Sequence, residues 1–139
     1  MTKSTVKKSH NLFHLNNKVI VITGALGLLG QKHVEVVAQN GGIPVILDIN
    51  EKEVFLAAKK IEQKYDVPAI GLNVDITNEI KIMDSCKKII KKYRHIDGLV
   101  NNAANNPKVE EIEGKNFSQL ENFPIEIWNK DIAVGLTGA

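Results

Sequence analysis

The chain has 139 residues, 43% of them hydrophobic and 24% charged, which is the composition of one ordinary globular domain. Its net charge is +2, yet the first eighteen residues hold four lysines and no acid, so the remainder carries 14 basic and 16 acidic side chains. That balance argues against a nucleic-acid partner. The single cysteine, Cys86, excludes an intrachain disulfide, and no apolar run approaches the roughly 18 residues of a membrane span. We expect a cytoplasmic protein with no membrane partner.

The chain divides into a short arm and a folded region. Residues 1–11 are mostly polar and basic, and we expect a flexible arm there. The rest alternates between short apolar runs and stretches with helical periodicity. Strands are predicted at 19–22, 43–47, 69–74 and 97–100, and helices from 28 to a C-cap at 40–42, at 51–65, and from an N-cap at Thr77 to Tyr93. The stripe predicted to be buried on the last helix is Ile82, Met83, Cys86, Ile89, Ile90 and Tyr93.

The stretch KVIVITGALGLLG, Lys18 to Gly30, organises this region. Its β-branched run predicts a strand buried on both faces, and the three glycines that follow lead into a helix. In such a turn Gly24 permits the tight bend, Gly27 lets a ligand approach the backbone, and Gly30 lets the helix lie close to the sheet. The helix N-terminus then offers free N–H groups and a positive dipole end to a pyrophosphate. The alternative is a tight packing turn without a ligand.

The alternation of strands and helices predicts an α/β fold with a doubly wound parallel sheet of strand order 3-2-1-4, a Rossmann-type arrangement. In this order the chain changes direction between the first and fourth strands, so a ligand crevice opens at the carboxyl ends of the strands. Gly24, Asp48, Asp75 and Asn101 all end predicted strands. We therefore expect these four residues to line the crevice together.

Two acidic residues have both a functional and a structural interpretation. Asp48 lies 18 residues after Gly30, where a carboxylate accepts hydrogen bonds from a ribose diol and repels a 2′-phosphate, which favours NAD over NADP. The alternative is that the segment from Asp48 to Glu51 only caps the next helix. Asp75 is a candidate ligand contact, and equally a turn former before Thr77.

Other reactive or charged side chains indicate no further site. Cys86 lies on the predicted helix stripe, so we expect it to pack in the core. The four histidines have no ligand-like spacing and no cysteine pair exists, so no metal site is predicted. The lysine-rich run 87–94 is interpreted as a solvated face, with a phosphate or an acidic partner as the alternative.

Five motifs in a fixed order carry a resemblance to a known family. They are LFHLNNKVIVITGALGLLG, the acid of ILDIN, the NVDITN segment, IDGLVNNAA and the closing WNKDIAVGLTGA. Over residues 12–139 the chain resembles the N-terminal, NAD-binding half of the short-chain dehydrogenase/reductase family. The resemblance implies an NAD(H)-dependent oxidoreductase acting on an alcohol/carbonyl pair, as a homo-oligomer.

The resemblance also implies roles for individual residues. Asp75 and Ile76 would hold the adenine through a carboxylate and a backbone N–H, and the element 101–104 would stabilise the sheet and border the cofactor ribose. The cofactor-binding residues implied are Gly24, Leu26, Gly27, Leu28, Leu29, Gly30, Asp48, Ile49, Asp75, Ile76, Asn102, Ala103 and Ala104.

Three departures from the family pattern bear on activity. The glycines are spaced Gly-x-x-Gly-x-x-Gly, whereas the commoner branch has Gly-x-x-x-Gly-x-Gly; a glycine still precedes the helix, so the pyrophosphate site should survive. Gly135 occupies the position of the family's helix-borne Asn, and this variant resembles members linked to surface-sugar or flagellin-glycan synthesis, which implies a sugar substrate. The family's Ser and Tyr-x-x-x-Lys are absent, so no catalytic residue is assigned.

Two functional hypotheses follow. In the first, this chain is the cofactor-binding half of a longer, truncated oxidoreductase, and is inactive alone because it lacks the proton donor that hydride transfer to a carbonyl requires. In the second, the chain is a non-catalytic dinucleotide-binding or interaction module. Substrate identity is expected to lie beyond Ala139 and in the 105–123 loop.

Overall fold

The computed structural model describes residues 13–105 and 122–139, so the expected arm at 1–11 and most of the 105–123 loop lie outside the described residues. The described chain forms one four-stranded parallel sheet in the order β3-β2-β1-β4, as predicted. The strands are β1 Val19–Thr23, β2 Ile43–Asp48, β3 Ile70–Asn73 and β4 Gly98–Val100. The helices are α1 Leu28–Gln39, α2 Glu51–Tyr65, α3 Glu79–Tyr93 and α4 Ile125–Ile132, the last continued by a π-helical segment, η2, Ala133–Thr137.

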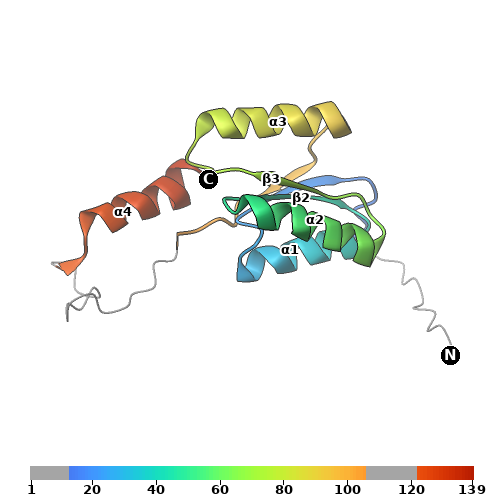
Figure 1. Cartoon of the computed structure of the whole chain (residues 1–139), viewed down its shortest axis with the longest axis horizontal. Coiled ribbons are helices and arrows are strands. Elements are labelled where there is room, and N and C mark those ends of the chain that lie inside the picture. Colours follow the sequence, from blue (N-terminus) through green and yellow to red (C-terminus); the bar gives the residue numbers. More distant parts are fainter. Residues whose placement is uncertain (1–12, 106–121) are drawn as a thin grey trace.

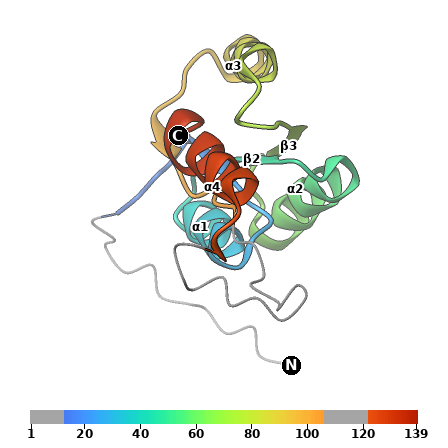
Figure 2. The ribbon, with the colours of Figure 1, turned by 90° about the vertical axis from the view of Figure 1, so that its left-hand side faces the viewer.

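The core consists of two layers, one on each face of the sheet. Alternate residues of β1 point to opposite faces, because side chains alternate along a strand. Val19 and Val21 join the cluster beneath α3, whereas Ile22 joins the cluster beneath α1 and α2. Val19 and Ile22 are both fully buried. Figures 1 and 2 show the resulting layers, with α1 and α2 on one face of the sheet and α3 on the other. The doubly wound α/β prediction is therefore confirmed.

Asparagine side chains begin two of the helices. Asn50 Oδ1 accepts a hydrogen bond from the amide of Glu53 at the start of α2, at 3.3 Å. Asn78 Oδ1 accepts from the amide of Lys81 at the start of α3, at 3.1 Å. The prediction that Thr77 caps α3 was therefore wrong by one residue. The Thr77 hydroxyl is engaged instead by the carboxylate that precedes it.

The predicted buried stripe of α3 is only partly buried. Ile89 is 2% exposed and Tyr93 packs partly against the same cluster, but Ile82 and Met83 are 39% and 51% exposed. Cys86 is also exposed, so the prediction that it packs in the core was wrong. The reason is that α3 meets the sheet along a narrow strip that includes Ser85 and Ile89, and the predicted stripe is wider than this strip.

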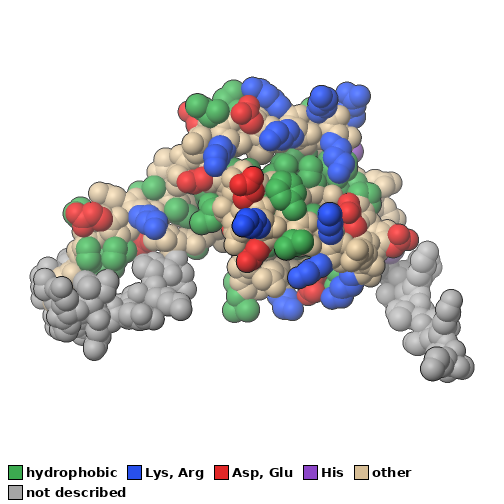
Figure 3. Space-filling model, in the orientation of Figure 1, with side chains coloured by type: hydrophobic (Ala, Val, Ile, Leu, Met, Phe, Trp, Pro, Cys, Tyr) green, Lys and Arg blue, Asp and Glu red, His purple; other side chains and the backbone are tan. Residues whose placement is uncertain are grey.

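The outer parts of the fold are solvated or open. The basic side chains at 87–94 are exposed, which matches the interpretation of a solvated face, and Figure 3 shows basic side chains along the outer side of α3. Leu99 of the edge strand β4 points to the α3 side of the sheet and is 59% exposed. No helix among the described residues is long and apolar enough to span a bilayer.

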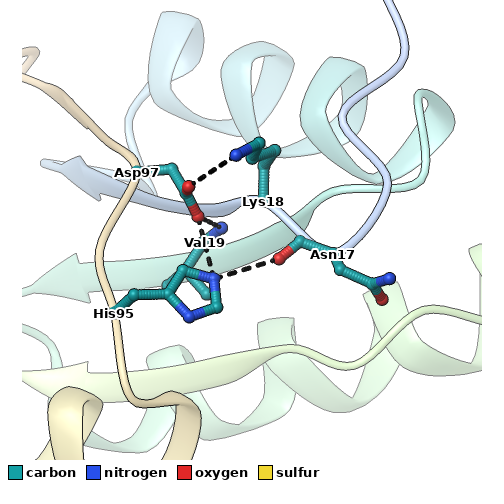
Figure 4. A network of polar contacts seen from close by, with 5 residues as sticks. All are labelled: Asn17, Lys18, Val19, His95 and Asp97. Carbon is teal, nitrogen blue, oxygen red and sulfur yellow. Dashed lines mark hydrogen bonds and ion pairs between the residues drawn. The ribbon is translucent and has the colours of Figure 1, made fainter.

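A polar network joins the segment before β1 to the segment before β4 (Figure 4). Asp97 accepts hydrogen bonds from Lys18 Nζ at 2.9 Å and from the amide of Val19 at 2.8 Å. His95 Nε2 lies 3.0 Å from the same carboxylate and 3.3 Å from the carbonyl oxygen of Asn17. The hydrogen bond from Lys18, then that from Val19, lowers the pKa of Asp97 below its ordinary value. The network closes the amino ends of β1 and β4, away from the carboxyl ends of the strands.

This network should make stability depend on pH in a defined direction. The pKa of Asp97 is lower in the folded chain than in the unfolded chain, so its contribution is complete above the unfolded value of about 3.9 and is lost as pH falls through the folded value. Urea unfolding of the unchanged chain and of Asp97→Asn should show an advantage for the unchanged chain at pH 6 that shrinks below about pH 4. An advantage that is the same at every pH would contradict this role. Asp84→Asn, which loses only a contact with the exposed Lys87, is the matched control and should cost less.

Candidate functional site

A cleft of about 840 Å³ lies at the carboxyl ends of the strands. All the residues that the resemblance implied for cofactor binding line it, whereas Asn101, expected in the crevice, is not in its lining. The prediction for Asn101 was wrong, and its neighbour Asn102 takes that place. Lining residues that were not predicted are Asn50, Glu53, Val74, Thr77, Asn105, Lys130, Ala133 and Val134. A second cavity of about 570 Å³ lies between α1 and α2.

The N-terminus of α1 opens into this cleft. Its N-cap residue, Gly27, has no side chain to bond the first-turn amides, and the first turn of α1 contains no acid. Helix geometry leaves the amides of Leu28, Leu29 and Gly30 without intrahelical acceptors. By contrast, α2 and α3 each have an Asn cap and a glutamate in the first turn. The α1 terminus therefore keeps its partial positive charge for an anion.

The three glycines of the turn differ in what surrounds them. Gly24 has φ +58°, and a Cβ there would lie 2.7 Å from the Cα of Ala103. At Gly30 a Cβ would collide with the Gly24 carbonyl oxygen and lie 2.7 Å from Ala25 Cα. At Gly27 a Cβ would meet only the carbonyl oxygen of Gly24, at 3.3 Å. Gly24 and Gly30 are thus required by the fold, whereas a side chain at Gly27 would meet one tight backbone contact, a weaker constraint than at the other two glycines.

Asp48 lies at the end of β2 and fixes the neighbouring loops. One carboxylate oxygen accepts from the amide of Leu26 at 3.0 Å, and the other accepts from the amides of Ile49 at 2.8 Å and Asn50 at 3.4 Å. The segment from Asp48 to Glu51 does cap α2, as the structural alternative predicted, and it does so through the side chain of Asn50. Asp48 also holds the turn after β1 against the start of α2, and the residue is part of the cleft lining.

Asp75 lies in the turn between β3 and α3. Its Oδ1 accepts hydrogen bonds from the Thr77 amide at 2.9 Å and from the Thr77 hydroxyl at 2.6 Å. These bonds, the hydroxyl bond first, lower the pKa of Asp75 below its ordinary value, so the side chain is a carboxylate at neutral pH. The turn-forming interpretation is observed, and it uses one oxygen. The residue also lines the cleft, so the two interpretations do not exclude each other.

A buried hydroxyl connects the ends of β1 and β4. Thr23, which is 5% exposed, accepts hydrogen bonds from the amides of Asn102 and Ala103, both at 3.0 Å. The Asn102 side chain returns two bonds, to the carbonyl oxygens of Thr23 at 2.9 Å and Gly24 at 3.0 Å. The strand predicted at 19–22 stopped before Thr23, which is the last residue of β1 in the structure. Its position directly before Gly24, as a polar residue ending an apolar strand, was the signal for this role.

The charge on the lining is uneven. Among the described residues that line the cleft, the acids are Asp48, Glu53 and Asp75, and the one basic residue is Lys130. Lys130 comes from α4, which Asn105 joins to the end of β4 through a 2.7 Å bond to Asp131. Gly135 lies in η2, and a Cβ there would have no neighbour within 4 Å among the described atoms. No group of three potential metal ligands occurs in the described part of the chain.

Comparisons with known proteins agree with this architecture. The chain matches the short chain dehydrogenase family over residues 18–139. It is 32% identical over 89 residues to the post-translational flagellin modification protein A of Campylobacter coli, an alignment covering 64% of this chain and 35% of that protein. It is also 32% identical over 127 residues to the NAD-dependent glycerol dehydrogenase of Listeria innocua, covering 91% of this chain and 45% of that protein.

Solved structures share the fold at lower identity. The NAD⁺-bound xylitol dehydrogenase has a TM-score of 0.78 at 22% identity, with coverage of 89% of this chain and 44% of that one. The NADPH-dependent 3-quinuclidinone reductase from Rhodotorula rubra has a TM-score of 0.76 at 19% identity, with coverage of 98% and 49%. The chain spans less than half the length of the relatives and structures named here. The family match and the parallel sheet together establish that this chain belongs to the short-chain dehydrogenase family.

Proposed function

We propose that this chain is the dinucleotide-binding half of an NAD(H)-dependent oxidoreductase that acts on an alcohol/carbonyl pair. The observation that carries the proposal is the uncapped N-terminus of α1, which opens into the cleft beside a carboxylate fixed at the end of β2. A dinucleotide needs both features, because its pyrophosphate is an anion and its ribose is a diol.

The cleft residues fit such a cofactor. The amides of Leu28, Leu29 and Gly30 would hold the pyrophosphate, and Asp48 would accept from the adenosine ribose. The volume of about 840 Å³ is within the range of small-molecule sites. Asp75 and Ile76 also line the cleft, and the family resemblance implies that they hold the adenine. When bound, the nicotinamide supplies or accepts the hydride.

The chemistry of hydride transfer also needs a proton at the substrate oxygen. A tyrosine serves this purpose when a nearby lysine ammonium and the cofactor lower its pKa. No Tyr-x-x-x-Lys occurs within the 139 residues, since neither Tyr65 nor Tyr93 has a lysine four positions later. We therefore assign cofactor binding to this chain and the proton relay to the other half of a longer protein. The absence of a Tyr-x-x-x-Lys from these 139 residues also favours the second candidate, a dinucleotide-binding or interaction module without catalysis.

The substrate is proposed from chemistry and likeness together. The relatives named above include a glycerol dehydrogenase and a flagellin modification protein, and a structural neighbour is a xylitol dehydrogenase. These names favour a polyol or a sugar as the alcohol/carbonyl pair of the whole protein. We further propose that the whole protein acts in the cytoplasm as a homo-oligomer.

Cofactor choice is the first prediction. NADH should bind more tightly than NADPH, because a carboxylate facing a 2′-phosphate costs on the order of 1 kcal/mol or more in repulsion and lost hydrogen bonds. Fluorescence titration with both nucleotides measures this, and Asp48→Asn should narrow the difference. Equal or tighter binding of NADPH by the unchanged chain would refute the role assigned to Asp48.

The glycine turn gives the second prediction. Gly27→Val should abolish dinucleotide binding and lower the unfolding midpoint less than a substitution at Gly30, because a Cβ at Gly27 meets one backbone oxygen at 3.3 Å whereas a Cβ at Gly30 collides with several backbone atoms. Gly30→Ala is the control for packing, and should cost about 1–3 kcal/mol of stability through overpacking against the turn after β1. Thermal unfolding and NADH titration of both variants separate the two effects. If Gly27→Val binds NADH with unchanged affinity, the turn is a packing turn that does not bind the cofactor.

Catalysis gives the third prediction. The 139-residue chain should bind NADH without reducing NAD in the presence of a panel of alcohols and polyols, because the proton relay is missing from its sequence. Absorbance of NADH at saturating substrate, with a mass-verified preparation, is the measurement. Turnover would contradict the account, since it would require a proton donor among these residues that no contact in the cleft reveals.

A further inference from the structure

We infer that Glu53, which the family resemblance did not single out, is a cofactor-specificity residue whose carboxylate supplies an unpaired negative charge at the adenosine end of the cleft. The inference rests on the proposed function, namely that the cleft binds a nicotinamide dinucleotide. It concerns the discrimination between a ribose 2′-hydroxyl and a 2′-phosphate. Glu53 lines the cleft together with Asp48 and Asn50.

The carboxylate of Asp48 already accepts several hydrogen bonds from within the protein. Its two carboxylate oxygens accept three backbone hydrogen bonds, from Leu26, Ile49 and Asn50. A carboxylate has about four lone-pair sites, so roughly one is left to accept from a ribose hydroxyl. Donors that point at a carboxylate also offset its field. Asp48 alone is therefore a weaker barrier to a phosphate than its charge suggests.

The side chain of Glu53 takes no part in capping α2. It is the third residue of α2, the position at which a capping-box glutamate reaches back to the amide of the N-cap residue. Here the Asn50 side chain accepts from the Glu53 amide at 3.3 Å, which is one half of the box. The amide of Asn50, which would complete the box, is donated to Asp48 instead, at 3.4 Å. The Glu53 carboxylate consequently has no cap partner, and within the described residues it forms no ion pair closer than 4 Å.

Glu53 also borders the second cavity, whose lining includes Lys60 and Lys64, but among the described ion pairs Lys64 is bound to Glu35 and neither lysine pairs with Glu53. The one basic residue in the described lining of the cleft is Lys130, which comes from α4, an element separate from α2 in sequence and in Figure 2. An NADP site needs a positive partner for the 2′-phosphate. This end of the cleft instead combines a fixed carboxylate with a free one. Glu51 carries the same charge in the same first turn but is not part of the lining, so it provides a matched control.

The test compares Glu53→Gln with Glu51→Gln by titration with NADH and with NADPH. Both changes remove one charge from the first turn of α2, so any effect of helix stability is shared. We expect Glu53→Gln to tighten NADPH binding about three- to fivefold and to leave NADH within about twofold, whereas Glu51→Gln should change either by less than about 1.5-fold. The gain should fall as salt is raised from 20 to 300 mM, since screening shortens the reach of the charge to about one Debye length.

The outcomes separate the inference from the proposal beneath it. If the unchanged chain binds NADH and the two glutamine variants behave alike toward NADPH, the inference is overturned and the proposed function stands. A gain in NADPH affinity that does not depend on salt also overturns it, because the effect would then be structural. If the unchanged chain binds neither nucleotide, the proposed function fails and the inference falls with it.

Discussion

The structure depends on the contact between the start of α1 and the turn that follows β1. Gly30 lies against the Gly24 carbonyl oxygen and the backbone of Ala25, at a separation that leaves no space for a side chain. This contact directs the axis of α1 at the carboxyl end of β1, so the unpaired amides of its first turn face the cleft. Because Ala25 is 1% exposed and belongs to the core, the orientation of the anion-binding terminus is fixed by packing.

Stability and function use opposite ends of the same sheet. At the amino ends, Asp97 joins the entry to β1 with the entry to β4 through Lys18 and the Val19 amide. At the carboxyl ends, Thr23 and Asn102 join the exits of those strands through their own hydrogen bonds. The two sets of bonds hold β1 and β4 in register from both ends. Because these bonds already hold the strands, the glycine turn does not need side-chain contacts of its own. Its glycines can therefore leave space for a ligand.

Much of this arrangement follows from local sequence signals. The β-branched run before Gly24 and the helical spacing after it predict the strand, the turn and the helix, because buried parallel strands and amphipathic helices have distinct periodicities. The strand order follows from right-handed crossovers between parallel strands. The cleft residues in turns were predicted as a group, since the carboxyl ends of neighbouring parallel strands meet at one edge.

The errors arise where a local signal has more than one physical solution. Thr77 and Asn78 are both good caps, and Thr77 lost that role because the Asp75 carboxylate already engages its amide and hydroxyl. Cys86 lies on an apolar stripe that is wider than the strip of α3 touching the sheet, and periodicity does not give the width of a contact. Lys130 lines the cleft from α4, which is far along the chain from most of the other lining elements. Local sequence patterns do not show which distant segments meet.

The central claim is that the first turn of α1 holds the pyrophosphate of a dinucleotide. An NMR titration that follows backbone amide signals during addition of NADH tests it most directly. We expect saturable shifts of the Leu28, Leu29 and Gly30 amides, with Leu56 and Ala57 in the cavity between α1 and α2 unaffected. Saturable shifts confined to that second cavity, with the first turn of α1 unmoved, would contradict it.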